Sequence, residues 1–397
     1  MKFCKRIQTV QPSMTLEITA LANELKAKGE DIIGFGAGEP DFNTPENVKQ
    51  AAIRAIQKND THYTPVPGTN ELKDAIIHKF KSDNGLTYQR DQIIASCGAK
   101  QSFFNLAQVL WEEGDEVIVP APYWVSYTEI IIYGGARPVI IDTTAETEFK
   151  ITPEQIDRAV TPNTRAIIIN SPSNPTGSAY TRAELEQIAE CALKHKLLIV
   201  SDEIYEKIVF DGFEQVSIAS LSPEVQKHCV VINGVSKCYA MTGWRIGYLA
   251  AEKEIVAQLN KLQSQSTSNP ASISQAASVE ALTGPRDDIA MMVAEFQKRR
   301  DLLMRLQSQI DGLSCYCPAG SFYAFPDYSA FYGKSYEGKP ISGSIELSRF
   351  LLKEAKVALV PGIAFGADNN IRLSFATSQE TIRRGLERIA GAMRSLR

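Results

Sequence analysis

Short, almost wholly apolar segments alternate with helical patterns through the middle of the chain. The segments 166–169 (Ala-Ile-Ile-Ile) and 197–200 (Leu-Leu-Ile-Val) contain no polar residue that could face water. Strands of this composition are covered on both faces, as in mostly parallel sheets whose connections are helices. The sequence therefore predicts an α/β protein built around a large, mostly parallel sheet.

Apolar periodicity and turn residues give the bounds of the expected elements. Strands are predicted at 92–96, 116–119, 137–141, 165–170, 197–202, 229–233 and 246–251, and helices at 45–58, 70–82, 99–112, 123–133, 153–160 and 181–195. After residue 252 this regular alternation of strands and helices ends. The remaining elements lie there and near the N-terminus. Helices are predicted at 14–28, 252–265, 271–282, 287–311, 342–355 and 378–395, with short strands at 322–326, 357–360 and 371–375. We expect a large domain at 48–285 and a smaller α+β domain formed by 1–47 and 286–397.

Composition excludes several classes of protein. The 397 residues are 44% hydrophobic and 22% charged, with a net charge of −4, so neither nucleic acid nor disorder is indicated. No window holds the roughly 18 apolar residues of a membrane span. The seven scattered cysteines indicate a reduced, cytoplasmic protein. The four histidines show no spacing typical of zinc ligands, and we expect no metal site.

Lys237 is the strongest candidate for a reactive residue. It follows the predicted strand 229–233, in a segment rich in glycine and small residues with few charged neighbours. Burial lowers the pKa of a lysine and frees its amine to form a Schiff base with an aldehyde or ketone. Taken alone, Lys237 could equally be an exposed lysine in a loop, as most lysines are.

Polar residues follow four of the predicted strands, where α/β proteins bind ligands. Gly98 and Ala99 open a helix whose free N–H groups could hold a phosphate, and Asn174 precedes a proline. Asp202 follows an apolar strand and, if ionised, needs a cationic partner. Arg245 lies beyond the last of these strands. Each position taken singly is also consistent with an ordinary turn or helix cap.

The glycines of 32–42 (Ile-Ile-Gly-Phe-Gly-Ala-Gly-Glu-Pro-Asp-Phe) do not form a dinucleotide-binding fingerprint. Glu39 stands where the third glycine would be, and no helix opens there. A nicotinamide-dependent dehydrogenase is therefore disfavoured, and a glycine turn that brings backbone close to a ligand is favoured.

A set of short motifs, in order along nearly the whole chain, resembles the fold type I pyridoxal-phosphate enzymes, and within them the class I aminotransferases of the bacterial aspartate aminotransferase branch. The motifs are Gly38-Glu-Pro-Asp-Phe, Tyr63-Thr-Pro-Val-Pro-Gly, Pro122-Tyr-Trp-Val-Ser-Tyr, Asn170-Ser-Pro-Ser-Asn-Pro-Thr-Gly, Ser201-Asp-Glu-Ile-Tyr-Glu, Ser236-Lys, Gly243-Trp-Arg-Ile-Gly-Tyr, Val360-Pro-Gly and Arg372-Leu-Ser. The resemblance implies a seven-stranded-type large domain and a homodimer with active sites at the interface.

The resemblance implies roles in binding pyridoxal 5'-phosphate. Lys237 would carry the cofactor covalently and move the substrate proton, and Asp202 would keep the pyridine nitrogen protonated. The other cofactor-binding residues implied are Tyr205 and Asn174 at the phenolic oxygen, Trp124 against the ring, and Gly98, Ala99, Arg245 and a second subunit's Tyr63 at the phosphate. Lys237, Asp202 and Tyr205 would be catalytic. Gly234 stands where animal-type relatives carry a serine that contacts the phosphate.

The substrate is implied in the same way. Arg372 would hold the α-carboxylate, which the backbone at Gly38 would approach, and Lys100 would pair with a distal carboxylate. Trp124 and Asn174 are the other substrate-binding residues implied. The expected reaction moves the amino group of aspartate to 2-oxoglutarate by a ping-pong mechanism, giving oxaloacetate and glutamate. An aromatic or broad-specificity transaminase and a lyase of the same fold remain alternatives. The uncharged Gln11, where prephenate-using members carry a basic residue, puts prephenate activity in question.

Overall fold

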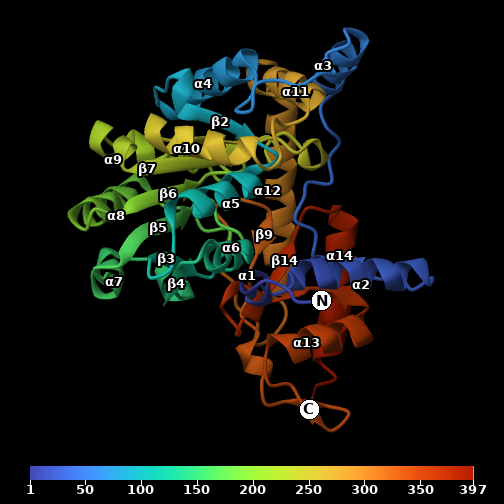
Figure 1. The fold of residues 1–397 in the computed structure, drawn as a ribbon. Helices are drawn as coiled ribbons and strands as arrows, with labels where there is room; N and C mark the ends of the chain where they lie inside the picture. Colours follow the sequence, from blue (N-terminus) through green and yellow to red (C-terminus); the bar gives the residue numbers. More distant parts are fainter. Residues whose placement is uncertain (397) are drawn as a thin grey trace.

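A seven-stranded sheet forms the centre of the computed structural model, which describes residues 1–396 (Figure 1). Its strands are β2 (Ile93–Ser96), β3 (Glu116–Ala121), β4 (Arg137–Asp142), β5 (Thr164–Asn170), β6 (Leu198–Asp202), β7 (Cys229–Gly234) and β8 (Gly247–Ala250). The order across the sheet is β2-β8-β7-β6-β5-β3-β4. Neighbouring strands are parallel except where β8 pairs with β2 and β7, which confirms the predicted fold class.

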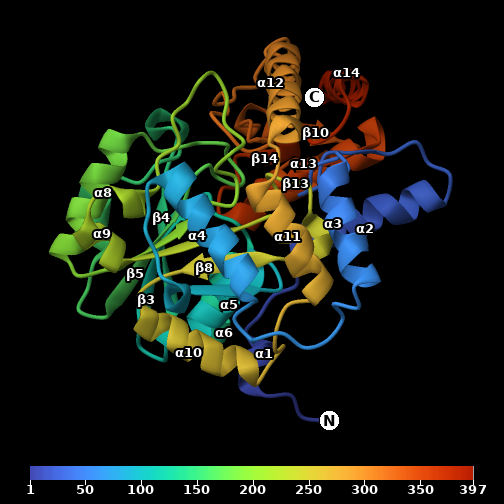
Figure 2. The same ribbon diagram turned by 90° about the horizontal axis from the view of Figure 1, so that it is seen from above.

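Apolar side chains of this sheet alternate between two cores, because successive residues of a strand face opposite sides. Ile167 and Ile199 belong to one core, whereas their neighbours Ile168 and Val200 belong to the other. The second core is closed by α5 (Ala99–Leu110), α6 (Ser126–Gly134) and α10 (Lys253–Ser264), which lie together on one side of the sheet in Figure 2. Helices α7 (Pro153–Ala159), α8 (Arg182–Lys194) and α9 (Pro223–Lys227) contribute to the first core.

The remaining elements lie beside this layered unit. They are α1 (Lys5–Gln8), α2 (Met14–Ala27), α3 (Glu46–Gln57), α4 (Asn70–Asn84), α11 (Ser272–Thr283), the long α12 (Asp287–Gln307), α13 (Ser344–Phe350) and α14 (Gln379–Met393). Three further sheets are small: β1 (Ile33–Gly34) with β12 (Val357–Ala358), β10 (Ser335–Tyr336) with β11 (Lys339–Pro340), and β13 (Val360–Pro361) and β9 (Tyr323–Ala324) on either side of β14 (Ile371–Ser374).

We propose that residues 1–47 and 286–397 act as one small domain against the large domain 48–285. Parallel pairing of β1 with β12 ties the N-terminal segment to the C-terminal part of the chain, and α12 runs along the junction (Figure 1). The boundary expected at residue 48 falls inside α3. Because a helix moves as one unit, a boundary just before Glu46 fits the structure better.

Two of the differences between the predicted and the observed elements lie in the C-terminal part of the chain. The expected strand 357–360 is two strands, since β12 pairs with β1 and β13 pairs with β14. The expected helix 342–355 begins at Ser344 and continues past Phe350 as a π-helical segment, Leu351–Ala355. Among the described residues, no helix combines the length and the apolar composition that crossing a membrane requires.

Candidate active site

One cavity of about 450 Å³ collects most of the predicted site residues. It lies where β5, β6 and β7 end and where the segments that carry Gly38 and Arg372 meet the sheet. Ten of the predicted residues line it: Gly38, Ala99, Lys100, Trp124, Asn174, Asp202, Tyr205, Lys237, Arg245 and Arg372. Strand register explains part of this gathering, because Asn170 pairs with Asp202 and Asp202 pairs with Ile232 across the parallel strands.

Lys237 is half-buried in the wall of the cavity. It follows β7, and its Nζ donates a hydrogen bond to the carbonyl oxygen of Gly38. Burial lowers the pKa of the Lys237 amine to about 8, with Glu39 opposing this shift and Arg372 adding to it. An amine with this pKa is partly neutral near pH 7 to 8, which a nucleophile requires.

Asp202 ends β6 and is 8% exposed. Its Oδ2 accepts a hydrogen bond of 2.6 Å from the Tyr127 hydroxyl, and its Oδ1 accepts one of 3.2 Å from the Ile204 N–H. Burial raises the pKa of the Asp202 carboxyl, and these two hydrogen bonds, together with the charge of Lys237, act against the rise. Within residues 1–396 no lysine, arginine or histidine forms an ion pair with Asp202. The carboxylate is therefore available to a cation that binds in the cavity.

Arg245 lines the end of the cavity next to α5, and Gly98 lies directly behind it. Gly98 caps α5 with a φ of +92°, and a Cβ there would lie 2.2 Å from Nη2 of Arg245. The Arg245 guanidinium donates to the carbonyl oxygens of Thr242 (2.9 Å) and Cys97 (3.2 Å). A cation packed against the free N–H groups of a helix start is an arrangement suited to phosphate.

Arg372 lies on β14 and is 2% exposed. Its Nη1 donates to Oδ1 of Asn174 (2.9 Å), and its Nη2 donates to the Gly36 carbonyl (2.9 Å). Its Nε is buried without a hydrogen-bond partner among the described residues. A buried donor left unpaired costs free energy, and an incoming carboxylate would satisfy it.

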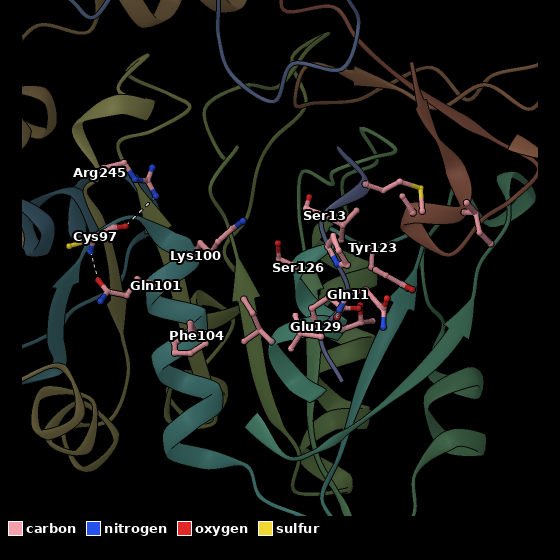
Figure 3. Close-up of a pocket in the computed structure, with 18 residues that line it drawn as sticks. Gln11, Ser13, Cys97, Lys100, Gln101, Phe104, Tyr123, Ser126, Glu129 and Arg245 are labelled. Atoms are coloured by element: carbon pink, nitrogen blue, oxygen red, sulfur yellow. Dashed lines mark hydrogen bonds between the residues drawn. The ribbon is translucent and has the colours of Figure 1, made fainter. Parts of the chain in front are cut away.

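Lys100 lies near the mouth of the cavity, on the first turn of α5. Its Nζ is 5.1 Å from the centre of the Trp124 ring, and burial lowers the pKa of its amine, as does the charge of Arg245. A second cavity, of about 590 Å³, adjoins here and shares Lys100 and Arg245 with the first. Figure 3 shows Lys100 of this second cavity between Arg245 on one side and Ser13 and Ser126 on the other.

Two predicted residues do not line the main cavity. Gly98 contacts it only through Arg245, and Tyr63 is 91% exposed. Two tyrosines that our sequence reasoning missed do belong to the site. Tyr127 holds Asp202, and the hydroxyl of Tyr323 lies 3.0 Å from that of Tyr205 while its ring lies 4.5 Å from the Arg372 guanidinium. Tyr127 ends the motif in which we had singled out only Trp124.

The charged side chains that line the cavity indicate which kind of ligand it can bind. Four cationic side chains line it (Lys100, Lys237, Arg245 and Arg372) against the two carboxylates of Glu39 and Asp202. Such an excess suits a ligand with several negative charges. The fold and this cavity together define an α/β enzyme with a half-buried lysine in its ligand pocket.

The chain belongs to the aminotransferase class I and II family, whose family model matches residues 30–389. It is 49% identical over 392 residues to an aspartate aminotransferase of Geobacillus stearothermophilus, covering 98% of each chain. It is 47% identical over 382 residues to the aspartate/prephenate aminotransferase of Cereibacter sphaeroides, covering 96% of each.

Solved structures agree with this assignment. The aspartate aminotransferase of Rhizobium meliloti superposes with a TM-score of 0.97 at 45% identity, over 100% of both chains. The aspartate aminotransferase of Thermus thermophilus with maleate superposes with a TM-score of 0.93 at 40% identity, over 99% of this chain and 100% of that one.

Proposed function

We propose that this protein is a pyridoxal-phosphate-dependent aspartate:2-oxoglutarate aminotransferase. The observation that carries the proposal is that the half-buried Lys237 amine, with its lowered pKa, and the buried Asp202 carboxylate line one cavity. The names of the relatives support the reaction, and the family supports the cofactor.

The residues present fit pyridoxal phosphate. Asp202 offers a buried carboxylate to a protonated ring nitrogen, and Arg245 with the Gly98–Ala99 turn offers donors to a phosphate. Asn174 and Tyr205 line the cavity between these two ends, and Trp124 lies near its mouth. When bound, the cofactor would act as an electron sink for the electron pair left on the substrate Cα.

Lys237 would act as the base and acid of the reaction. Its pKa of about 8 allows its amine to take a proton from the substrate Cα and to return one on the other side of the transfer. The Gly38 carbonyl, which accepts a hydrogen bond from Nζ, holds the amine on the small-domain side of the cavity. Tyr127 would keep Asp202 ionised, and Tyr205 would be held in place by Tyr323.

Arg372 and Lys100 would recognise a dicarboxylic substrate at its two ends. The unpaired Nε of Arg372 would bind the α-carboxylate, beside the backbone of Gly38. Lys100 would pair with the distal carboxylate, since its ammonium lies in the cavity wall without a carboxylate partner among the described residues. The maleate named with the Thermus thermophilus structure is also a dicarboxylate.

The test is a comparison of donors in the wild type and in Lys100→Met. Aspartate with 2-oxoglutarate should give oxaloacetate with ping-pong kinetics. The substitution should lower kcat/KM for aspartate about 10- to 100-fold, as for a lost charged hydrogen bond, and should change that for alanine little. Equal losses for both donors would remove Lys100 from substrate recognition. Pyruvate, ammonia and hydrogen sulfide formed from cysteine without an oxo-acid acceptor would favour a lyase instead.

Prephenate is a second candidate acceptor, because relatives of 45–47% identity are named aspartate/prephenate aminotransferases. Gln11 lies in the wall of the second cavity, and its N–H donates to Oε2 of Glu129 at 2.7 Å. Residue 11 therefore adds no positive charge to this cavity wall, where prephenate-using members carry a basic residue. An assay with prephenate and glutamate decides whether the enzyme uses it.

We also propose a cytoplasmic homodimer with shared active sites. The exposed aromatic ring of Tyr63 is the feature that favours the dimer, because it would be covered when it reaches the phosphate end of a second subunit's cavity. Mixing Tyr63→Phe chains with Lys237→Ala chains tests this arrangement. If each site takes Tyr63 from one subunit and Lys237 from the other, the mixed dimer regains one intact site.

A further inference from the structure

Three metal-ligating side chains from two helices meet outside the candidate active site. Asp157 lies on α7, while Cys191 and His195 lie at the end of α8. One ligand atom from each lies within 4.8 Å of the other two. Nε2 of His195 is 2.5 Å from Oδ1 of Asp157, and Sγ of Cys191 is 3.6 Å from the same oxygen.

The cluster is separate from the cavity described above. Helix α8 starts after the carboxyl end of β5 and ends before the amino end of β6, so its last turn lies at the opposite edge of the sheet from Lys237. None of the three residues lines either cavity. In Figure 1, α7 and α8 lie on the outer side of the large domain, away from α12.

The chemistry of the three groups suits zinc. Zn²⁺ binds thiolate, imidazole and carboxylate at about 2.0–2.3 Å in a tetrahedron, so its ligand atoms lie roughly 3.3–3.8 Å apart. Cys191 and His195 are four residues apart and face the same side of a helix. Our sequence reasoning, which expected no metal ligands, overlooked this spacing.

Without a metal, Asp157 is shared among competing donors. Nζ of Lys194 lies 3.0 and 3.1 Å from its two oxygens, and the His195 ring and the Cys191 thiol approach Oδ1. Cys191 is buried, and burial with the nearby carboxylate raises the pKa of its thiol to about 11. A bound metal would replace the thiol proton and would release the Lys194 ammonium to solvent.

We propose that Asp157, Cys191 and His195 bind one Zn²⁺, which clamps α7 to α8, with water as the fourth ligand. Three ligands from two elements that are already packed need little rearrangement. The role of the bound Zn²⁺ would be structural, because the site lies at the edge of the sheet opposite the candidate active site.

The experiment titrates the tag-free holoenzyme, first stripped of metal, with Zn²⁺ against a chromophoric chelator. We expect one Zn²⁺ per chain, bound roughly 10-fold or more weakly by Cys191→Ser, His195→Ala and the surface substitution Asp157→Asn. Cys317→Ser and His228→Ala are matched controls, since Cys317 is exposed and His228 faces Glu224 on α9, and both should bind as the wild type does. Co²⁺ should give a thiolate charge-transfer band that Cys191→Ser abolishes.

Lys194→Met separates a metal site from a simple ion-pair cluster. Removing the competing ammonium should tighten Zn²⁺ binding. No stoichiometric Zn²⁺ binding by the wild type, or binding that neither Cys191→Ser nor Asp157→Asn weakens, would overturn the proposal. Asp157→Asn changes only an exposed side chain, so the test holds even if the buried Cys191 does not tolerate substitution.

Discussion

The hydroxyl of Tyr127 donates a 2.6 Å hydrogen bond to Oδ2 of Asp202, and both side chains are buried. A hydrogen bond to the charged form of a carboxyl lowers its pKa, whereas burial raises that of Asp202. Tyr127 therefore orients Asp202 and favours its ionised form, in a site where burial favours the neutral acid.

Tyr127→Phe tests how far the ionisation of Asp202 depends on this hydrogen bond. Losing a charged hydrogen bond of about 1.5 kcal/mol should lower kcat/KM roughly 10-fold and raise the pKa of Asp202. The acid limb of the pH–rate profile should move to higher pH, and the cofactor should dissociate more readily in a fluorescence titration. Tyr328→Phe is the matched control, because the buried Tyr328 hydroxyl has no partner among the described residues. An unshifted acid limb in Tyr127→Phe would contradict this role.

Lys237 should make the stability of the cofactor-free enzyme depend on pH. The unfolded chain holds its proton up to about pH 10.5, whereas the folded protein loses it near pH 8. The free energy of unfolding should therefore rise with pH between these values, and below pH 8 the folded state should carry the whole penalty, roughly 3 kcal/mol.

Lys237→Met removes that penalty. The variant should resist urea better than the wild type at pH 7, and the difference should shrink as the pH rises above 8. Lys28→Met, which removes an exposed lysine paired with Glu24, should leave the rise in stability between pH 8 and 10.5 in place. A Lys237→Met protein less stable than the wild type at pH 7 would show that the Gly38 hydrogen bond outweighs the burial of the charge.

Arg372→Lys should show whether the planar guanidinium is required. Lysine keeps the charge, but its donors all lie on one nitrogen and cannot reproduce the planar, spread guanidinium that contacts Asn174 and Gly36. We expect KM for aspartate to rise and kcat/KM to fall about 10- to 100-fold. Arg349→Lys, on the exposed side of α13, is the control. Unchanged kinetics in Arg372→Lys would remove it from carboxylate binding.

Gly98→Ala should prevent Arg245 from occupying its position, because the added Cβ would lie 2.2 Å from Nη2. Gly114→Ala is a matched control with φ of +100° and no atom within 4 Å of its Cβ. Both variants should lose roughly 1 kcal/mol of stability from backbone strain. Only Gly98→Ala should lose cofactor affinity, measured by equilibrium dialysis, and equal affinities in both variants would contradict the phosphate assignment.

The sheet could be predicted because its strands are marked by burial on both faces. The apolar runs that end at Asn170 and Asp202 appear as β5 and β6 with nearly the expected bounds. Helix α12 ends at Gln307 rather than 311, since helix ends depend on local capping. The two-residue strand β1 was missed because its glycine-rich sequence has no strand pattern, and it exists only through pairing with β12.

The site was predictable where residue type alone indicates chemistry, as for Lys237, Asp202 and Arg372. Tyr127 and Tyr323 were missed because a buried tyrosine in a sequence looks like a core aromatic residue. Their function depends on which atom each hydroxyl meets, and that depends on packing between segments 75 and 118 residues apart. Cys191 and His195 were overlooked because their third partner, Asp157, comes from another helix.

Trapping the cofactor on the protein tests the central claim most directly. Borohydride reduction of the yellow holoenzyme, followed by proteolysis and mass spectrometry, should place one pyridoxyl group on Lys237 and on no other lysine. The Lys237→Ala protein should carry no such label. A colourless wild-type protein, or a label on Lys100 or any lysine outside the cavity, would contradict the account.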